Sequence, residues 1–382
     1  MLLTTSRSFN GHRLGGPLTL EVQGERVASI AEDADATRSG AVGLPEGWLL
    51  APGFVDVHCH GGGGASFSDG SDGIEQVLTT HRSAGTTSMM ASTVTESVDD
   101  LSERARSLGP FVSAGELLGI HLEGPWLSPA YRGAHEAELL QTPSWESFER
   151  VANAAPGAVR MVTLAPELPG GTEFVTRLVA RGVVAAVGHT DATHAQATAA
   201  FDAGVSAATH LFNAMRGIHH REPGPVTAAL ERDDVWVELI ADGVHLAPPI
   251  LRAAMRVAGD RAVLVTDAMA AAGQPDGDYR LGGLAVRVTD GVARLAAGGA
   301  IAGSTLTMAE AVRYAINTAG VRAEAVLRAA TSAPATMVRA EDVGRLGPGT
   351  WADAVVLDEE WVVRGVLRHG KWVKPLPWCC GS

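Results

Sequence analysis

Histidine and acidic side chains, which bind metals and move protons, come directly after apolar segments at several places in this sequence. One of these places is a His-Cys-His segment at 58–60, where alternation along an extended strand puts both imidazoles on one face and Cys59 on the other. A glutamate and two further histidines each follow another apolar segment. Imidazole and carboxylate donors suit zinc, iron and similar divalent metals. The candidate metal ligands are His58, His60, Glu123, His189 and His210.

Asp267 ends a further apolar segment, in Val-Thr-Asp-Ala. A carboxylate at such a place can cap a helix. Beside a metal site, it can instead bind the metal or act as a base toward a metal-bound water, whose pKa the metal lowers to about 7. The five candidate ligands favour this second interpretation of Asp267.

The elements that would position these residues repeat one pattern eight times: a short apolar run of strand-forming residues ends in polar residues, and a helix-like stretch follows. Alternating strands and helices predict parallel βαβ units, and eight of them predict a (β/α)8 TIM-type barrel with its active site at the carboxyl ends of the strands. The predicted strands are Phe54–Val57, Thr87–Met90, Leu117–Leu122, Met161–Leu164, Val183–Val187, Ala207–Ala208, Val237–Ile240 and Ala262–Val265.

Alanine-rich segments with helical spacing lie between these runs and beyond the last. The competing fold is a doubly wound open sheet, whose usual G-x-G-x-x-G signature is missing after the first strand. The predicted helices are Gly73–Ala84, Pro143–Ala154, Glu173–Arg181, His194–Ala203 and Pro248–Val257, with a last helical region at Leu306–Thr331.

Both ends of the chain read as short strands around turn residues. We expect residues 1–50 and 346–382 to pair into one small β-sandwich domain, while residues 51–345 form the barrel. A glycine-punctuated β-hairpin insertion is expected near 275–303. The fold class is therefore α/β, with a barrel and a small β domain built from both chain ends.

Composition narrows the range of functions. The 382 residues carry a formal net charge of −13 and are 46% hydrophobic, which is typical of a globular protein and argues against general nucleic-acid binding. No apolar stretch approaches the roughly 18 residues of a membrane helix, so no membrane association is expected. The start of the chain lacks signal-peptide features, and the three cysteines, Cys59, Cys379 and Cys380, form no disulfide framework. These features predict a cytoplasmic protein.

The segment Pro-Gly-Phe-Val-Asp-Val-His-Cys-His-Gly (52–61) resembles the metal-binding opening of the amidohydrolase superfamily. More specific motifs follow in order along nearly the whole chain, and together they resemble the family of N-acetylglucosamine-6-phosphate deacetylases. These motifs are His-Leu-Glu-Gly-Pro (121–125), Gly-Ala-His-Glu (133–136), Gly-His-Thr (188–190), Thr-His-Leu-Phe-Asn-Ala-Met (209–215), Arg-Glu-Pro-Gly (221–224), Asp-Gly-Val-His (242–245), Thr-Asp-Ala (266–268) and Ala-Gly-Ser-Thr-Leu-Thr-Met (302–308).

The resemblance implies metal-dependent hydrolysis of the acetamide of N-acetyl-D-glucosamine 6-phosphate to D-glucosamine 6-phosphate and acetate, in amino-sugar catabolism and cell-wall recycling. Glu123, His189 and His210 would bind the main metal, and His58 and His60 would hold a second in members that keep this pair. One or two ions are therefore possible, with zinc as the first choice and iron, cobalt or manganese as alternatives. Because the only lysines are Lys371 and Lys374, no carboxylated lysine can bridge two metals in the barrel, and Glu123 is the protein's candidate bridge.

The resemblance also assigns roles around the metal. Asp267 matches the general base and acid, and Arg221 matches the contact to the substrate phosphate. His219 and His220 would add positive charge, in the same subunit or a neighbouring one, because the family is commonly a homodimer. The residues that match substrate contacts are Ala134, His135, Asn213, Ala214, Arg221, Asp242, His245, Ala302 and Gly303.

Other histidines have simpler interpretations. His121 is expected to be a core residue or to support a ligand. The histidines outside the motifs are expected to be solvated, and they are His12, His81, His194 and His369.

Two alternative functions remain. The first is another amidohydrolase, acting on a different N-acyl or cyclic amide. The second is a non-catalytic sugar-phosphate sensor, which would need Arg221 but not Asp267 together with five metal donors. A serine-nucleophile deacetylase has no support, because no G-x-S-x-G occurs.

Overall fold

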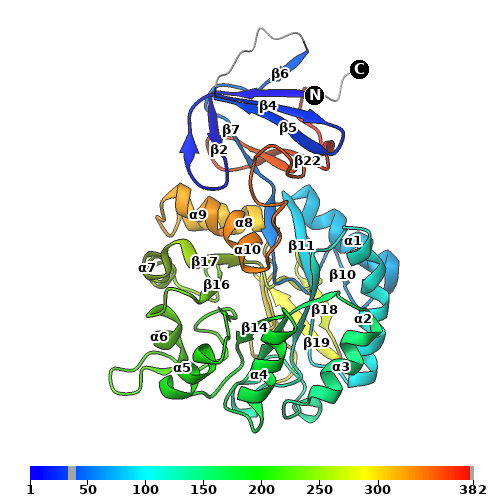
Figure 1. Ribbon diagram of the computed structural model, residues 1–382, viewed down its shortest axis with the longest axis vertical. Coiled ribbons are helices and arrows are strands. Elements are labelled where there is room, and N and C mark those ends of the chain that lie inside the picture. The colour runs from blue at the N-terminus through cyan, green and yellow to red at the C-terminus, as the bar shows by residue number, and fades with distance from the viewer. Residues whose placement is uncertain (33–39, 379–382) are drawn as a thin grey trace.

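The eight predicted barrel strands form one parallel sheet in the computed structural model, which describes residues 1–32 and 40–378 (Figure 1). Neighbours in the sheet follow the order of the sequence, as expected for successive βαβ units. The strands are β8 (Phe54–Asp56), β11 (Thr86–Thr93), β12 (Gly119–Glu123), β13 (Val159–Leu164), β14 (Val184–Val187), β15 (Ala207–Ala208), β16 (Trp236–Ile240) and β17 (Ala262–Val265). Even the shortest predicted run, β15, is a strand.

The first and last strands meet just beyond their carboxyl ends. Cys59 and Ala268 form an isolated parallel bridge there, and the amide nitrogen of Asp267 donates to the carbonyl of His58 over 2.8 Å. The segments that close the barrel thus also carry His58 and Asp267, two of the expected site residues.

Helices surround the sheet and cover its outer face, which explains why the strands read as continuous apolar runs. The helices α2, α6 and α10 add to those expected from the sequence, and the last expected helical region, Leu306–Thr331, divides into α8 and α9. The helices are α1 (Gly70–Ser83), α2 (Val98–Ser113), α3 (Trp145–Ala154), α4 (Gly171–Ala180), α5 (His194–Asp202), α6 (Gly224–Leu230), α7 (Pro248–Ala258), α8 (Met308–Asn317), α9 (Ala323–Ala329) and α10 (Ser332–Met337). None of the helices in the described residues combines the length and apolarity needed to cross a bilayer.

Two further sheets built from both chain ends pack against each other at the top of Figure 1, where both termini lie. One has the order β5-β4-β1-β6 and the other β23-β22-β21-β7-β2-β3. Side chains of both, such as Leu20 and Val356, share one core. The strands are β1 (Leu2–Thr5), β2 (Arg7–Phe9), β3 (Leu14–Gly15), β4 (Leu18–Gln23), β5 (Arg26–Ala31), β6 (Ala41–Gly43), β7 (Leu49–Pro52), β21 (Ala354–Leu357), β22 (Val363–Arg368) and β23 (Lys371–Lys374).

The predicted fold class, a TIM-type barrel with a small β-sandwich from both chain ends, is confirmed. Cys379 and Cys380 lie outside the described residues. The insertion after β17 is a three-stranded antiparallel sheet of β18 (Gly277–Leu281), β19 (Leu284–Thr289) and β20 (Val292–Leu295). It lies toward the end of the barrel away from the small domain (Figure 1). A short hairpin, β9 (Gly61–Gly62) with β10 (Ala65–Ser66), follows the His-Cys-His segment.

Candidate active site

The carboxyl ends of the barrel strands turn sharply where the expected site residues lie. Glu123 is the last residue of β12. His189, His210 and Asp267 lie within two residues of β14, β15 and β17, and their φ angles are 47°, 27° and 48°. Residues other than glycine rarely adopt this left-handed region, and such strained positions concentrate at functional sites. At Asp267, Ser304 holds the turn, because its amide donates to the Asp267 carbonyl over 2.7 Å.

One cluster of donor atoms is centred on the first carboxylate oxygen of Glu123. Glu123 Oε1 lies 3.0 Å from His210 Nε2 and 3.2 Å from His189 Nε2. The two imidazole nitrogens are 3.1 Å apart. All three side chains are buried, so they form a closed set of three donors that face one another.

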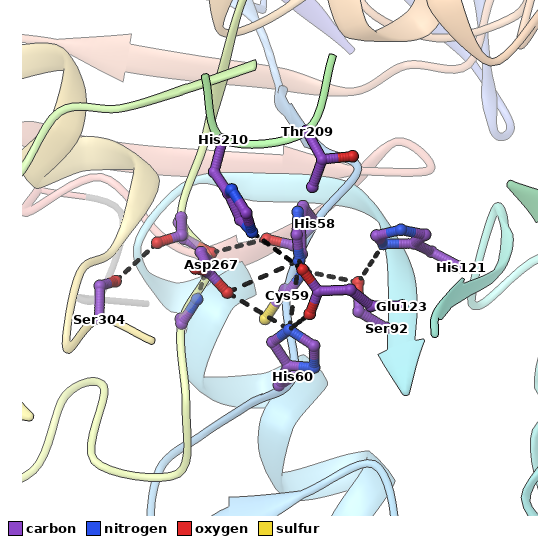
Figure 2. Close-up of polar contacts among 12 residues, drawn as sticks. His58, Cys59, His60, Ser92, His121, Glu123, Thr209, His210, Asp267 and Ser304 are labelled. Atoms are coloured by element: carbon purple, nitrogen blue, oxygen red, sulfur yellow. Dashed lines mark hydrogen bonds and ion pairs between the residues drawn. The ribbon is translucent and has the colours of Figure 1, made fainter. Parts of the chain in front are cut away.

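A second cluster of donor atoms lies on the side of Glu123 that faces His58, His60 and Asp267 (Figure 2). His60 Nε2 lies 3.2 Å from Glu123 Oε2 and 3.3 Å from Asp267 Oδ1. His58 Nε2 lies 3.2 Å from His60 Nε2 and 3.6 Å from Asp267 Oδ1. The side chains of His58, His60, Glu123 and Asp267 point toward one another in Figure 2, and Glu123 alone belongs to both clusters.

These separations fit metal coordination. For metal–ligand bonds of about 2.1 Å, a tetrahedral site places its donors roughly 3.4 Å apart. Five of the donors were expected from the sequence, and His58, His60 and Glu123 form a group whose ligand atoms all lie within 4.8 Å of one another. The residues present therefore fit a divalent metal, and the two clusters offer places for one or two ions.

The buried carboxylates of the two clusters are ionised and lie beside positive charge. Burial would raise the pKa of Glu123, but the charge of His58 and the hydrogen bonds of other histidines lower it well below its ordinary value. Burial would likewise raise the pKa of Asp267, which His58 and His60 lower instead. Burial lowers the pKa of His60, while hydrogen bonds to Asp267 and Glu123 raise it to about 9. Ionised carboxylates held out of water need positive charge beside them.

Second partners fix the orientation of two imidazoles. His189 Nδ1 lies 3.0 Å from the carbonyl oxygen of Tyr131, so this nitrogen donates and Nε2 keeps its lone pair for a metal. Burial and the neighbouring His135 lower the pKa of His189 to about 4, which keeps the ring neutral. His58 Nδ1 lies 3.0 Å from Glu238 Oε2. Glu238 was not among the residues expected from the sequence, although a glutamate inside the apolar run Trp236–Ile240 is an available signal.

A cavity of about 260 Å³ opens above the clusters and brings together most of the expected residues. The hairpin insertion and the segments around it add Val94, Leu281, Ala300 and Ile301 to its wall. The expected residues that line it are His60, Glu123, Ala134, His135, His189, His210, Asn213, Ala214, His245, Asp267 and Gly303.

Four expected residues do not line this cavity. His58 lies beneath it with no exposed surface, and Ala302 is also fully buried. The Asp242 carboxylate accepts from His245 over 2.7 Å, so it supports His245 and faces a neighbouring cavity instead. Arg221 lies outside the cavity, on an exposed turn closed by a bridge between His219 and Glu222.

The remaining histidines either pack in the interior, where they contact other side chains, or lie nearer the surface. His121 is buried and bonded to Ser92 Oγ and Thr163 Oγ1 at 2.9 and 2.8 Å, which agrees with a supporting role. The expectation that His81 is solvated is wrong: it is fully buried and contacts Cys59 Sγ at 3.4 Å. His81 lies on the buried face of α1, where the helix covers β9. His369 is only half-buried and stacks on Trp351, so it is not fully solvated either.

Comparisons with known proteins agree with this geometry. The amidohydrolase family model matches residues 49–373. The N-acetylgalactosamine-6-phosphate deacetylase of Escherichia coli O157:H7 is 37% identical, over 85% of this chain and 87% of its own. The N-acetylglucosamine-6-phosphate deacetylase of Lysinibacillus sphaericus is 36% identical, over 91% and 90%. A Mycobacterium smegmatis N-acetyl-D-glucosamine-6-phosphate deacetylase, solved in complex with N-acetyl-D-glucosamine-6-phosphate, is 44% identical over 98% of this chain and 99% of its own, with a TM-score of 0.94.

Proposed function

This chain belongs to the amidohydrolase family, and from its cavity and its relatives we propose its reaction: it hydrolyses the acetamide of N-acetyl-D-glucosamine 6-phosphate to D-glucosamine 6-phosphate and acetate. The relatives favour this reaction over hydrolysis of another N-acyl or cyclic amide. The observation that carries the proposal is the Asp267 carboxylate, which lines the cavity beside Glu123, His189 and His210.

Asp267 has the geometry and the charge of the proton carrier. Its lowered pKa keeps the carboxylate ionised, so it can take a proton from the attacking water as the new C–O bond forms. It then gives that proton to the amide nitrogen while the C–N bond breaks. The amine leaves in a neutral form and the acetyl group leaves as acetic acid, which then gives its proton to the amine or to solvent and becomes acetate.

His135 supplies a hydrogen-bond donor on the same wall. The backbone amide of Thr95 donates to His135 Nδ1 over 3.2 Å, so the ring carries its proton on Nε2. That nitrogen lies 3.6 Å from Glu123 Oε2, beside the donor clusters. We assign it to the substrate's acetyl oxygen or a sugar hydroxyl.

The residues that would hold the metal are those of the two clusters. Glu123, His189 and His210 would bind the main ion, and His58 and His60 would bind a second, with Glu123 as the bridge. When bound, a divalent metal polarises the acetyl carbonyl and lowers the pKa of the attacking water. Zinc is our first choice because imidazole and carboxylate donors at tetrahedral spacing suit it.

Arg221 is the residue that we propose to bind the substrate phosphate, and its position on the surface supports a homodimer. Its guanidinium lies 2.7 Å from His220 Nε2 on a turn that also exposes 58% of Ile218. A turn that carries donors and an apolar residue outward suits insertion into a neighbouring subunit. We therefore propose that Arg221 reads the phosphate in the partner's cavity. Because a charged sugar phosphate does not cross a bilayer unaided, we place the reaction in the cytoplasm.

Acetate release from metal-loaded protein tests the proposal. We expect turnover with N-acetylglucosamine 6-phosphate and little with unphosphorylated N-acetylglucosamine. Equal rates on both sugars would mean that the protein does not recognise the phosphate. No acetate at any substrate concentration would overturn the proposed reaction. Since one relative carries the name of the galactosamine epimer, N-acetylgalactosamine 6-phosphate belongs in the same assay.

A further inference from the structure

Glu238, on β16, is a buried carboxylate that none of the expected roles includes. Its side chain has no exposed surface. Oε2 accepts from two metal-site residues: from His58 Nδ1 over 3.0 Å and from the backbone amide of His210 over 3.2 Å. The carbonyl of Glu238 also accepts from the amide of Leu211 over 2.8 Å. One residue thus contacts both donor clusters.

The contact with His58 decides which of its ring nitrogens can bind a metal. Because the carboxylate accepts at Nδ1, the neutral ring that binds a metal keeps its proton on Nδ1 and its lone pair on Nε2. Nε2 is the nitrogen that faces His60 Nε2 and Glu123 Oε1, at 3.2 and 3.5 Å. His60 Nδ1 and His210 Nδ1 have no hydrogen-bond partner in the described part of the chain, so Glu238 is the side chain that holds a ring of the second cluster.

Burial of the Glu238 carboxylate in this place costs free energy of folding. Its second oxygen, Oε1, has no partner among the described residues. A half-partnered carboxylate buried among apolar strands disfavours folding unless positive charge lies nearby. The second cluster is the nearest place where such charge would be held.

We propose that Glu238 is the positioning residue of a second metal subsite formed by His58, His60 and Glu123. It holds His58 in the tautomer and orientation that bind an ion there. The main subsite depends on it less, because Tyr131 fixes His189 separately. This inference rests on the proposed metal-dependent function and assigns its two-ion form to this chain.

Metal binding at defined free zinc concentrations tests the inference without an activity assay. We expect two ions per chain in the unaltered protein. In Glu238→Gln, the affinity for the second ion should fall by about 10- to 100-fold, while the first ion stays. His58→Asn should lose the same ion, and a higher free zinc concentration should restore it in Glu238→Gln but not in His58→Asn.

Thr163→Val is the matched control. Thr163 is a fully buried side chain of the neighbouring interior that bonds His121 and Thr209 at 2.8 Å. It should keep both ions. If Glu238→Gln does not fold, Glu238→Asp keeps the charge but shortens the reach, and it should weaken the second ion alone.

Three results would overturn the inference: a single ion in the unaltered protein at saturating zinc, an unchanged second ion in Glu238→Gln, or loss of both ions together. None depends on deacetylation. An unaltered protein that binds two ions but releases no acetate would defeat the proposed reaction and leave the role of Glu238 standing.

Discussion

The proposed metal end and the proposed phosphate end of the active site are built in opposite ways. At the metal end, His58, Glu123 and Asp267 are only 0, 3 and 8% exposed, and each lies at or just past the end of a barrel strand. At the phosphate end, Arg221 lies on an exposed turn outside the cavity. One end is complete within a single chain, whereas the other presents its cation to the surroundings.

The difference shows what each kind of element can fix. Strand ends are held by the hydrogen-bond ladders of neighbouring strands, so six donor side chains from five strand ends meet at one point. The turn at 219–222 has only a local bridge to hold it. We therefore expect that a second surface, that of the partner subunit, places Arg221.

Asp267→Asn should cause the largest loss. The substitution keeps the shape but removes the proton carrier, and general acid–base groups contribute about 10²- to 10⁴-fold to the rate. We expect kcat to fall by about 10³-fold while the ion at Glu123, His189 and His210 remains. Steady-state kinetics and metal analysis measure the two effects.

Asp290→Asn is the matched control for that variant. Asp290 has a similar left-handed backbone, with φ of 52°, but lies exposed on the turn between β19 and β20. It should leave kcat unchanged. Near-normal turnover in Asp267→Asn would mean that another group moves the proton.

Arg221→Ala should cause the next largest loss, confined to the phosphorylated substrate. A hydrogen bond to a charged group is worth about 1.5 to 3 kcal/mol, or roughly 10- to 100-fold. We expect kcat/KM to fall by that factor for the sugar phosphate and to stay the same for N-acetylglucosamine. Arg256→Ala, at an exposed arginine of α7, is the control.

Mixed dimers show whose cavity Arg221 serves. Coexpressed Asp267→Asn and Arg221→Ala subunits should regain activity, because one site in each mixed dimer combines Asp267 of its own chain with Arg221 of the partner. No recovery, in dimers shown to be mixed, would place Arg221 in its own chain's cavity and break the contrast between the two ends.

The same contrast explains what could be predicted from the sequence. Each barrel strand is an apolar run with a polar residue beyond it, so His189, His210 and Asp267 could be located without a structure. Glu238 escaped because it lies within a strand, where side chains are expected to be apolar. The Tyr131 carbonyl that orients His189 has no side-chain signature at all.

Turns were harder to predict than strands. Asp242 was expected to touch substrate, but its carboxylate also accepts from the amides of Val244 and His245, both over 2.8 Å, and so closes its own loop. A short polar side chain that can bond to its own backbone often does so. Motif identity therefore located the residue, while local hydrogen bonding decided its role.

Asp242→Asn should cause a smaller loss of kcat/KM, and this loss should depend on pH. Burial lowers the pKa of His245, but the hydrogen bond and charge of Asp242 raise it above its ordinary value. Removing that charge lowers the pKa, so His245 should lose its proton at a lower pH. If protonated His245 binds substrate, the alkaline limb of kcat/KM should move to lower pH. We expect a loss of up to about tenfold at pH 8 and little at pH 6, since one pKa unit is a factor of ten.

The pair of Glu231 and His194 provides the control for this variant. It has a similar separation of 2.8 Å but lies on the outside of the molecule. Glu231→Gln should leave the pH profile of kcat/KM unchanged. An unshifted profile in Asp242→Asn would show that His245 acts only as a neutral group.

Asp353→Asn should have the smallest effect on catalysis, and it tests whether burial alone distinguishes the metal end. Asp353 is 3% exposed but does not line the active-site cavity, and burial raises its pKa to about 6. Its protonated form is favoured in the folded state, so wild-type stability should fall as pH rises from about 4 to 6, by up to about 3 kcal/mol. Asn carries no charge, so the variant should lack this slope and be the more stable protein at pH 8, with unchanged kcat and KM.

Asp358, whose pKa is lowered by hydrogen bonds from Val362 and Arg364 despite burial, should contribute the opposite slope. Thermal unfolding at pH 4, 5, 6 and 8 measures the Asp353 slope, whereas the Asp358 slope lies below about pH 4. Identical slopes in wild type and Asp353→Asn would show that Asp353 stays ionised when buried.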